Sequence, residues 1–413
     1  MTTTITNARV FDGERLLDEH TVVIDGAHVG AVGGPVPSGS TVVDAHGATL
    51  LPGLIDAHTH TSVDGLRDAL AFGITTELEM MGYWTRQERQ EVAARDDIAD
   101  LRSAGPAISA PGGHPSELMA DVEHAWDAPH PGGVGDGHAH DFEMPSASTP
   151  DEAAAFVAAR VAEDADYIKV MIEEGSVLGH PGLPLLSNAT LAAAVREGHR
   201  HGKLVIAHVL TAQATLQALA AGVDGLAHVF LDRPHTPELV AAIAASGAFV
   251  TPCLCLNSSI MGITGATLAA DERVRSRLSE AWLDTLSSSF NTYPQGRLDD
   301  VFATVVALHR AGVDLLAGTD VSPFPFPHLG GLAHGVSVHH ELRLLVAAGL
   351  TPAEALRAAT AVPARRFGLA DRGRIAPGAR ADLLLVDGDP TTDIADTLAI
   401  RAVWRRGTRL ATH

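Results

Sequence analysis

Two histidines, His58 and His60, follow an apolar run at 50–57. Side chains alternate along a strand, so a strand that ends in His-x-His directs both imidazoles to the same side. Two imidazoles that point together from a strand end supply half of the ligands of a transition-metal site. Because the chain contains 22 histidines, this pair needs support from the rest of the sequence.

Four more ionisable side chains lie in or at the end of later apolar runs. Lys169 lies within YIKVM, and His208 follows LVIA. His228 follows GLA, and Asp320 follows LLAGT. One buried histidine on its own is most often an ordinary core residue. Burying all six ionisable side chains together costs free energy, and coordination to a metal ion offsets that cost. The pattern therefore predicts a metal centre at the ends of several strands.

Lys169 has three possible roles inside an apolar strand. Its ammonium group can reach solvent along the strand, or it can pair with Glu173 or Glu174. Burial can instead lower its pKa, and a neutral amine can add carbon dioxide to become a carbamate. A carbamate is an anion with two oxygens, which is able to bridge two metal ions.

Four further residues are candidates for contact with a substrate. His114, in the turn PGGHP, either touches substrate or faces water. Trp84 either lines the pocket or caps the second helix. Phe324 and Phe326 alternate along a proline-stiffened segment after Asp320, where they form an apolar wall for the substrate or pack under neighbouring loops.

The two cysteines, Cys253 and Cys255, lie within an apolar run at 249–255. With a spacing of two, they would face the same way on a strand. We expect small buried hydrophobic side chains here, in preference to a disulfide or to metal ligands. A second His-x-His pair, His138 and His140, falls in a glycine-rich stretch and is expected to be a solvated loop.

Short apolar segments alternate with helical patterns over most of the chain. The strand candidates lie near 54–58, 74–80, 106–110, 167–172, 204–209, 225–229, 249–255 and 315–320. The helical patterns include 150–164, 188–201, 211–221, 236–246 and 297–311. This alternation predicts an α/β fold with a parallel sheet, either a (β/α)8 TIM barrel or a doubly wound open sheet. Candidate ligands at the carboxyl ends of different strands favour the barrel.

The two ends of the chain read as short strands that are too small to fold alone. We therefore expect a small β-sandwich formed by residues 1–52 and 369–413, with the barrel at 53–368. The segment 111–150, rich in Gly, Pro, His and Asp, is longer than a plain connector and is expected to lie over the mouth of the site.

Composition limits the partners. The formal net charge of −21 argues against nucleic acid and anionic membranes. No apolar run reaches transmembrane length, and the start of the chain lacks a basic region followed by an apolar one. We expect a soluble, cytoplasmic protein of 413 residues that acts on a small molecule, as a monomer or a homo-oligomer.

The motifs GLIDAHTH, YIKVM, IAHV, GLAHVF and GTD, and the tail around ELRLLVAAGLTPAEALRAAT, together resemble the amidohydrolase superfamily over nearly the whole chain. The nearest branch holds imidazolonepropionase-like proteins, Xaa-Pro dipeptidases and a zinc arginine carboxypeptidase. The resemblance implies two divalent ions, most often zinc, bridged by a carbamate on Lys169. It implies that one ion is held by His58, His60 and Asp320, and the other by His208 and His228.

Two departures from the superfamily pattern leave the substrate open. Many relatives have Thr-Thr-Val-Arg-Asp after the second strand, whereas this chain has Leu78 and Glu79 in place of the arginine and aspartate. The loop after Lys169 often reads as a Gly-Gly turn in relatives, and here it contains Glu173 and Glu174.

The sequence thus predicts a metal-dependent hydrolase for an amide, peptide or cyclic amide bond. Two ions about 3.5–4 Å apart lower the pKa of a bridging water so that hydroxide forms near neutral pH. Asp320 would take the proton and pass it to the leaving nitrogen. No arginine cluster follows the strand ends, so we expect a compact, largely apolar substrate rather than a polyanion. A lactone or ester hydrolase is the alternative enzyme, and a non-catalytic scaffold would have no need for the intact ligand set.

Overall fold

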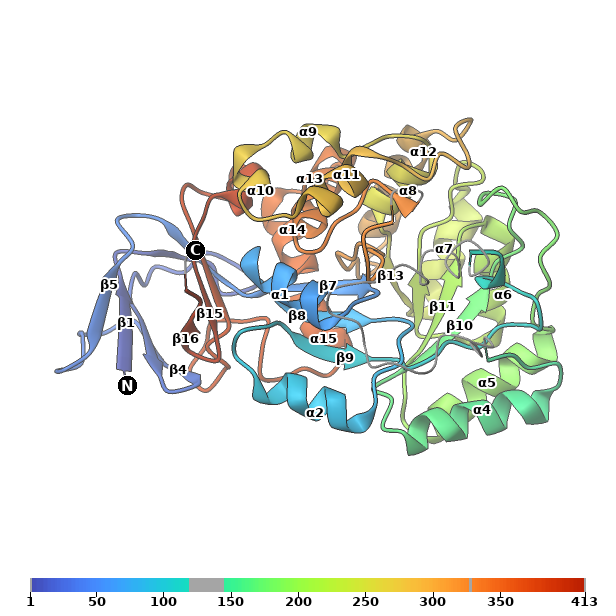
Figure 1. The fold of residues 1–413 in the computed structure, drawn as a ribbon, viewed down its shortest axis with the longest axis horizontal. Helices are drawn as coiled ribbons and strands as arrows, with labels where there is room; N and C mark the ends of the chain where they lie inside the picture. Colours follow the sequence, from blue (N-terminus) through green and yellow to red (C-terminus); the bar gives the residue numbers. More distant parts are fainter. Residues whose placement is uncertain (1, 119–144, 327–328, 412–413) are drawn as a thin grey trace.

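The computed structural model of the chain describes residues 2–118, 145–326 and 329–411 (Figure 1). Most of the segment 111–150, together with His138 and His140, falls outside the described residues. The described part is an α/β fold in which parallel central sheets are flanked at one end by two mixed sheets.

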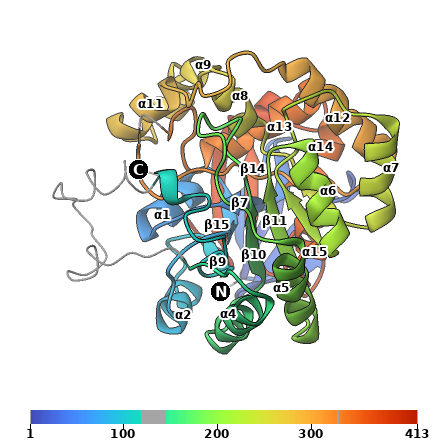
Figure 2. The same cartoon turned by 90° about the vertical axis from the view of Figure 1, so that its right-hand side faces the viewer.

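The central strands form two sheets, in the orders β7-β8-β9 and β10-β11-β12-β13, and all of their pairings are parallel. Figure 2 shows the strands in the middle with helices around them. Because parallel strands point the same way, their carboxyl ends gather at one edge, where the predicted ligands lie. The strands are β7 (Leu54–Thr59), β8 (Ile74–Glu79), β9 (Asp100–Ser103), β10 (Ile168–Ile172), β11 (Val205–Val209), β12 (Gly225–Ala227) and β13 (Phe249–Thr251).

The helices that follow the middle strands begin at hydroxyl side chains that cap their first turn. Thr149, Ser187, Thr211 and Thr236 each accept a hydrogen bond from a backbone N–H in the helix that they precede. The five predicted helices are confirmed, with bounds within two residues of the prediction. They are α4 (Pro150–Ala162), α5 (Asn188–Arg200), α6 (Ala212–Ala221), α7 (Pro237–Ser246) and α12 (Leu298–Arg310).

The remaining α-helices in the described part of the chain are α1 (Val63–Ala71), α2 (Arg86–Ala94), α8 (Leu254–Ile260), α9 (Ala266–Ala269), α10 (Glu272–Arg275), α11 (Glu280–Ser287), α13 (Val336–Ala348), α14 (Pro352–Ala358) and α15 (Ala361–Arg366). Of these, α1, α2 and α15 pack on the strands β8, β9 and β7, respectively.

Three strand predictions need correction. The candidates at 106–110 and 315–320 are not regular strands, and each makes only isolated parallel bridges, such as Ile108 to Val170 and Val250 to Leu315. The third regular strand is instead β9, because Pro106 has no N–H with which to continue a ladder. The candidate at 249–255 ends early, since Pro252 and the left-handed Cys253, at φ 49°, turn the chain into α8.

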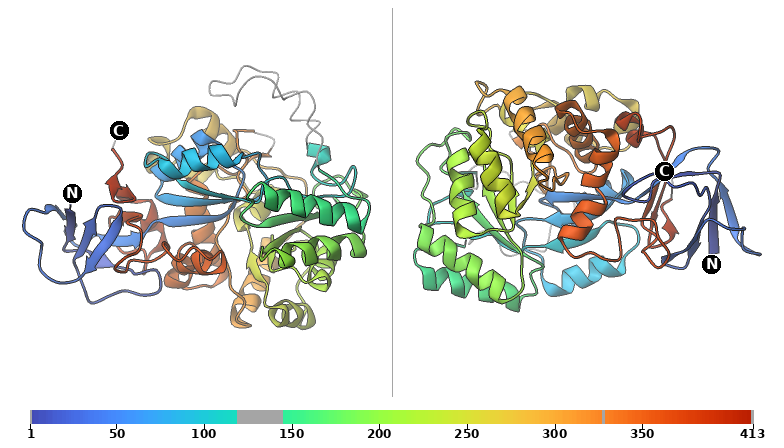
Figure 3. Two further views of the ribbon diagram at one scale, coloured as in Figure 1. Left: turned by 90° about the horizontal axis from the view of Figure 1, so that it is seen from below. Right: turned by 180° about the vertical axis from the view of Figure 1, so that it is seen from behind.

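Strands from both ends of the chain lie side by side in one of the two flanking sheets (Figure 3). One sheet has the order β4-β3-β1-β5, and the other has the order β16-β15-β14-β6-β2, in which β6 pairs antiparallel with β14. Ile5, Leu50, Leu383 and Trp404 share one buried cluster there, so the two ends build a common core. The elements are β1 (Thr2–Thr6), β2 (Arg9–Val10), β3 (Val22–Asp25), β4 (His28–Val32), β5 (Thr41–Asp44), β6 (Thr49–Pro52), β14 (Leu383–Val386), η2 (Ile394–Leu398), β15 (Ile400–Arg405) and β16 (Thr408–Arg409).

A buried group of charges joins these sheets to the central strands. Asp100 of β9 contacts Arg372, lies 2.8 Å from Nη1 of Arg380 and lies 3.5 Å from Nη2 of Arg405. Burial alone would raise the pKa of Asp100, but the arginines, Arg372 foremost, bring it down to about 2. The carboxylate is therefore ionised at neutral pH and ties the carboxyl-terminal segment to the third strand.

No helix in the described part of the chain is both long enough and apolar enough to cross a membrane.

Candidate metal centre

His58, His60 and Asp320 come together at the carboxyl end of β7. The Oδ1 atom of Asp320 lies 2.9 Å from Nε2 of His58 and 3.0 Å from Nε2 of His60. One donor atom from each of the three side chains lies within 4.8 Å of the others. Two imidazole nitrogens that converge on one carboxylate oxygen form a compact donor set of the kind that binds a transition metal.

His208 of β11 and His228, which follows β12, lie beside this trio. The ring of His228 lies 4.7 Å from that of His58 and 5.0 Å from that of His208. Lys169 lies on the adjacent strand β10, where Met171 pairs with His208, and it is near enough for the charge of Asp320 to affect its pKa. The structure thus gathers all the predicted ligands at one end of the parallel strands.

Several polar atoms in this cluster are buried without a hydrogen-bond partner among the described residues. Leaving such atoms unpaired costs free energy, and native proteins leave few of them. The donor set, mostly imidazole with a carboxylate, fits a divalent transition ion. The unpartnered atoms include Nδ1 of His58, Nζ of Lys169, Nε2 of His208 and both ring nitrogens of His228.

Burial keeps most of the imidazoles neutral, which is the form that binds metal. It lowers the pKa of His58 to about 3 and those of His208 and His228 well below the ordinary value. His60 differs, since Asp320 and Glu79 outweigh burial and raise its pKa to about 9.

The cationic and anionic members of the cluster are shifted as well. Burial lowers the pKa of Lys169 to about 8, so its neutral amine is much more accessible near neutral pH than that of an exposed lysine. Burial would raise the pKa of Asp320, but the imidazoles, His58 foremost, hold it well below its usual range. Asp320 is therefore ionised and available to accept a proton.

Three buried acids that were not predicted as site residues support the cluster. Glu79 lies with Oε1 3.7 Å from Nδ1 of His60, and Glu173 lies with Oε2 3.5 Å from Nε2 of His208. Asp56 accepts hydrogen bonds from the backbone of His58 at 3.1 Å and from the hydroxyl of Thr319 at 2.6 Å. Glu79 and Glu173 thus place carboxyl groups near two of the imidazoles without hydrogen-bonding to them, and Asp56 holds the backbone that carries His58. The signal in the sequence was an acid within or just beyond a buried strand.

His114 lies next to the metal ligands. Its ring centroid is 4.7 Å from that of His208, and its Nδ1 is 2.5 Å from Oε1 of Glu117. Because His114 is only 6% exposed, the interpretation as a water-exposed turn histidine is wrong. Contact with a substrate stays a prediction.

The positions of the other predicted substrate residues do not test whether they contact a substrate. Trp84 precedes Thr85, the N-cap of α2, and packs half-buried against the main core, so it does not itself cap the helix. Phe324 and Phe326 contact each other edge to face, with ring centroids 6.2 Å apart. The prediction that this pair walls the substrate site stays a prediction.

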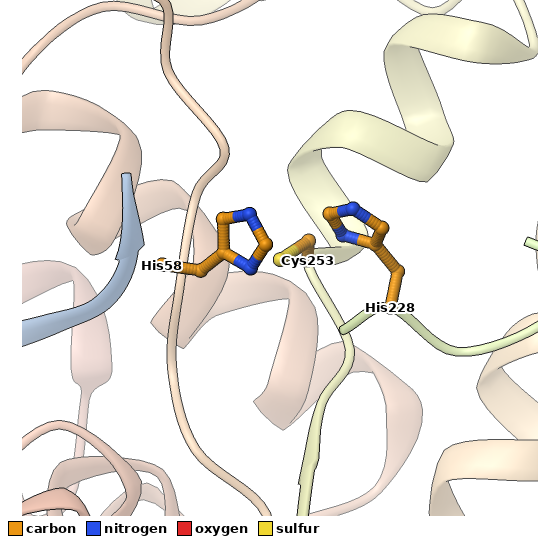
Figure 4. Close-up of side chains that lie close together, drawn as sticks. All are labelled: His58, His228 and Cys253. Carbon is orange, nitrogen blue, oxygen red and sulfur yellow. The ribbon is translucent and has the colours of Figure 1, made fainter. Parts of the chain in front are cut away.

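The prediction that both cysteines are buried is confirmed, but they do not share one face of a strand. Cys255 lies in α8 and its thiol contacts the carbonyl oxygen of Thr319 at 3.4 Å. Cys253 lies before the helix, with its sulfur close to His58 and His228 (Figure 4).

Comparison with known proteins gives three findings. The family model described as Amidohydrolase family matches residues 49–410. An imidazolonepropionase of Cereibacter sphaeroides is 27% identical over 97% of this chain and 94% of its own, and an ochratoxinase of Aspergillus niger is 25% identical over 87% of this chain and 75% of its own. A solved structure of a Xaa-Pro dipeptidase with bound methionine in the active site covers 100% of both chains with a TM-score of 0.73 at 21% identity, which shows likeness of fold.

Proposed function

The chain belongs to the amidohydrolase family, and on that premise we propose that it is a metal-dependent hydrolase of an amide, peptide or cyclic amide C–N bond. The observation that carries the proposal is the gathering of imidazoles, a lysine and a carboxylate, several with unpartnered buried atoms, at one end of the parallel strands. The similarity to an imidazolonepropionase and an ochratoxinase supports the same reaction class.

We also propose that the two central sheets belong to one (β/α)8 barrel at 53–368, with a sandwich of 1–52 and 369–413 beside it. The bridges from Ile108 to Val170 and from Val250 to Leu315 support this arrangement. So does the hydrogen bond of 2.8 Å from the N–H of Ala57 to the carbonyl of Ala317. A barrel would bring the carboxyl ends of all strands around one mouth, as the site requires.

Two divalent ions, most often zinc in such a donor set, would be held by this cluster. When bound, the ions supply Lewis acidity, which lowers the pKa of water and polarises a carbonyl group. Lys169 would contribute a carbamate to both ions, since burial favours its neutral amine. The other proposed ligands are His58, His60, Asp320, His208 and His228.

Asp320 would move the proton during the reaction. It is ionised, 17% exposed in its side chain and therefore able to reach a reactant, and its Oδ2 lies 3.6 Å from Nε2 of His228. A carboxylate in this position can accept a proton from the attacking water and return it to the leaving nitrogen. Asp56 would keep the segment that carries Asp320 in register with β7 through its bonds to His58 and Thr319.

We propose a compact, largely apolar substrate. Phe324 and the buried Phe326 follow four and six residues after Asp320, and the half-buried Phe324 offers aromatic surface. The carboxyl side chains of Glu117 and Glu173, 7% and 0% exposed, lie on either side of the His114–His208 pair, so a polyanion would meet acidic groups there.

A substrate panel tests the proposal. Metal-loaded protein is assayed with apolar N-acyl amino acids, dipeptides and lactams, beside lactones and phosphorylated or dicarboxylate amides, and bound metal is counted in the same preparation. We expect metal-dependent turnover of an apolar amide or lactam that chelation abolishes. Faster turnover of lactones would reassign the reaction to ester hydrolysis, and faster turnover of the anionic amides would refute the substrate class.

A further inference from the structure

Cys253 lies where the chain turns from β13 into α8. It occupies the N-cap position of α8, but its thiol makes no capping hydrogen bond. Glu341 of α13 satisfies the start of that helix instead, by accepting hydrogen bonds of 2.9 Å from the backbone N–H groups of Leu254 and Cys255. The thiol of Cys253 is therefore not engaged in capping.

That thiol lies close to two of the proposed metal ligands. Donor atoms of His58, His228 and Cys253 all lie within 4.8 Å of one another, and Figure 4 shows the sulfur between the two imidazoles. The three residues are 1%, 1% and 0% exposed, in that order.

A second, independent observation points to a ligand at this place. Neither ring nitrogen of His228 has a hydrogen-bond partner among the described residues, and neither does Nδ1 of His58. A fully buried imidazole without any partner is costly unless something binds it. The thiol thus lies within 4.8 Å of one ring nitrogen of each histidine, beside imidazoles that retain unpartnered nitrogens.

We propose that Cys253, which lies between a ligand of each ion, His58 and His228, is a sulfur donor that gives the metal centre a preference for thiophilic divalent ions. This inference rests on the metal centre proposed above. Thiolate ligands select ions such as Zn²⁺, Co²⁺ and Cd²⁺, whereas carboxylate and water ligands suit Mn²⁺ and Mg²⁺. A bound ion would be held by the thiolate form of Cys253, so metal binding would release one proton from the protein.

Cys255 provides a matched control. It is 1% exposed and only two residues away, but its thiol contacts the Thr319 carbonyl at 3.4 Å and it is not part of the group with His58 and His228. The chain has only these two cysteines. Any thiolate–metal signal in a Cys255→Ser protein must therefore come from Cys253.

The experiment titrates the full chain, freed of metal by a chelator, with Co²⁺ alone and records near-ultraviolet and visible absorption. We expect a sulfur-to-cobalt charge-transfer band in the wild type and in Cys255→Ser, and its loss in Cys253→Ser. If Cys253→Ser does not fold, the Cys255→Ser spectrum by itself decides the question.

Competition between Cd²⁺ and Mn²⁺ gives a second readout. Cys253→Ser should weaken Cd²⁺ binding by at least the roughly 10–100-fold seen when a residue behind a ligand is lost, and should change Mn²⁺ binding far less. Cobalt bound without the band in Cys255→Ser would overturn the role of Cys253 and leave the metal centre standing. No cobalt binding to the wild type would overturn the metal centre itself, and the sulfur ligand with it.

Discussion

Lys169 should destabilise the metal-free protein, so its replacement by methionine should stabilise it. The side chain is 1% exposed, its Nζ has no hydrogen-bond partner among the described residues, and burial lowers its pKa from 10.5 to about 8. Methionine has a similar length and carries no charge, so Lys169→Met imitates the neutral amine.

The magnitude follows from the shift in pKa. At about 1.4 kcal/mol for each factor of ten in the dissociation constant, the change from 10.5 to about 8 corresponds to about 3 kcal/mol. Between these two pH values the unfolded chain binds the proton and the folded chain does not, so wild-type stability rises with pH across that window. Below pH 8 Lys169 is protonated in both states, and the free energy of unfolding is lowered by the full cost of burying its charge. Lys169→Met should therefore gain about 3 kcal/mol at pH 7, and the gain should vanish above about pH 10.5.

Urea unfolding of chelator-treated protein at pH 7 and at pH 10 measures this difference. Lys203, half-buried and the only other lysine of the chain, supplies the control variant Lys203→Met, which should change stability little. Equal stability of Lys169→Met and wild type at pH 7 would refute the reasoning. A gain of equal size at both pH values would attribute the effect to packing and not to charge.

The same variant tests the carbamate. Saturating Zn²⁺ stabilises a protein in proportion to the logarithm of its concentration over Kd, by about 2.7 kcal/mol at a hundredfold excess over Kd. This gain should be largely lost in Lys169→Met, and ¹³C-labelled bicarbonate should give a carbamate resonance in wild type and Lys203→Met but not in Lys169→Met. A full Zn²⁺ response in Lys169→Met would contradict the proposed bridging ligand.

Two further predictions concern single carboxylates. Asp320→Asn should retain most of its metal by mass spectrometry while kcat falls by about 10²–10⁴-fold, because the proton acceptor is gone; wild-type kcat in a fully metallated variant would remove that role. Asp100 has a pKa of about 2 against an ordinary 3.8, so its ionised form adds about 2 kcal/mol to the free energy of unfolding above pH 4. This contribution is lost as the pH falls toward 2. Asp100→Asn should therefore be less stable than wild type at pH 7 and approach wild type in acid. Urea unfolding across this pH range checks the second prediction, and a constant difference down to pH 2 would show that charge is not the cause.

Local rules in the sequence were enough to place the regular elements. Helices α4 to α7 begin at Thr or Ser caps and bury residues spaced by three and four, so their bounds could be read within two residues. The strands at 54–58 and 204–209 were also evident, because both of their faces are buried and apolar residues predominate in them. The strand prediction was wrong near two prolines, because Pro106 and Pro252 interrupt segments that have the composition of strands.

The candidate site divides in the same way. His58 and His60 could be paired from the alternation of a strand, which is a local property. Motifs and strand ends predicted which other residues would join this pair, and the structure brings them together. They are His208, His228, Lys169 and Asp320.

Only the tertiary structure decided which neighbours these groups have. Cys253 reads as a core residue because nothing nearby in the sequence marks it, but a left-handed turn after β13 places its sulfur beside His58 and His228. Asp100 meets Arg372 across 272 positions, and Glu341 caps a helix 87 positions before it. Periodicity and capping depend on residues a few positions apart and can be read from the chain. Contacts that set charge, burial and ligand identity depend on how strands and helices pack, and no local pattern encodes them.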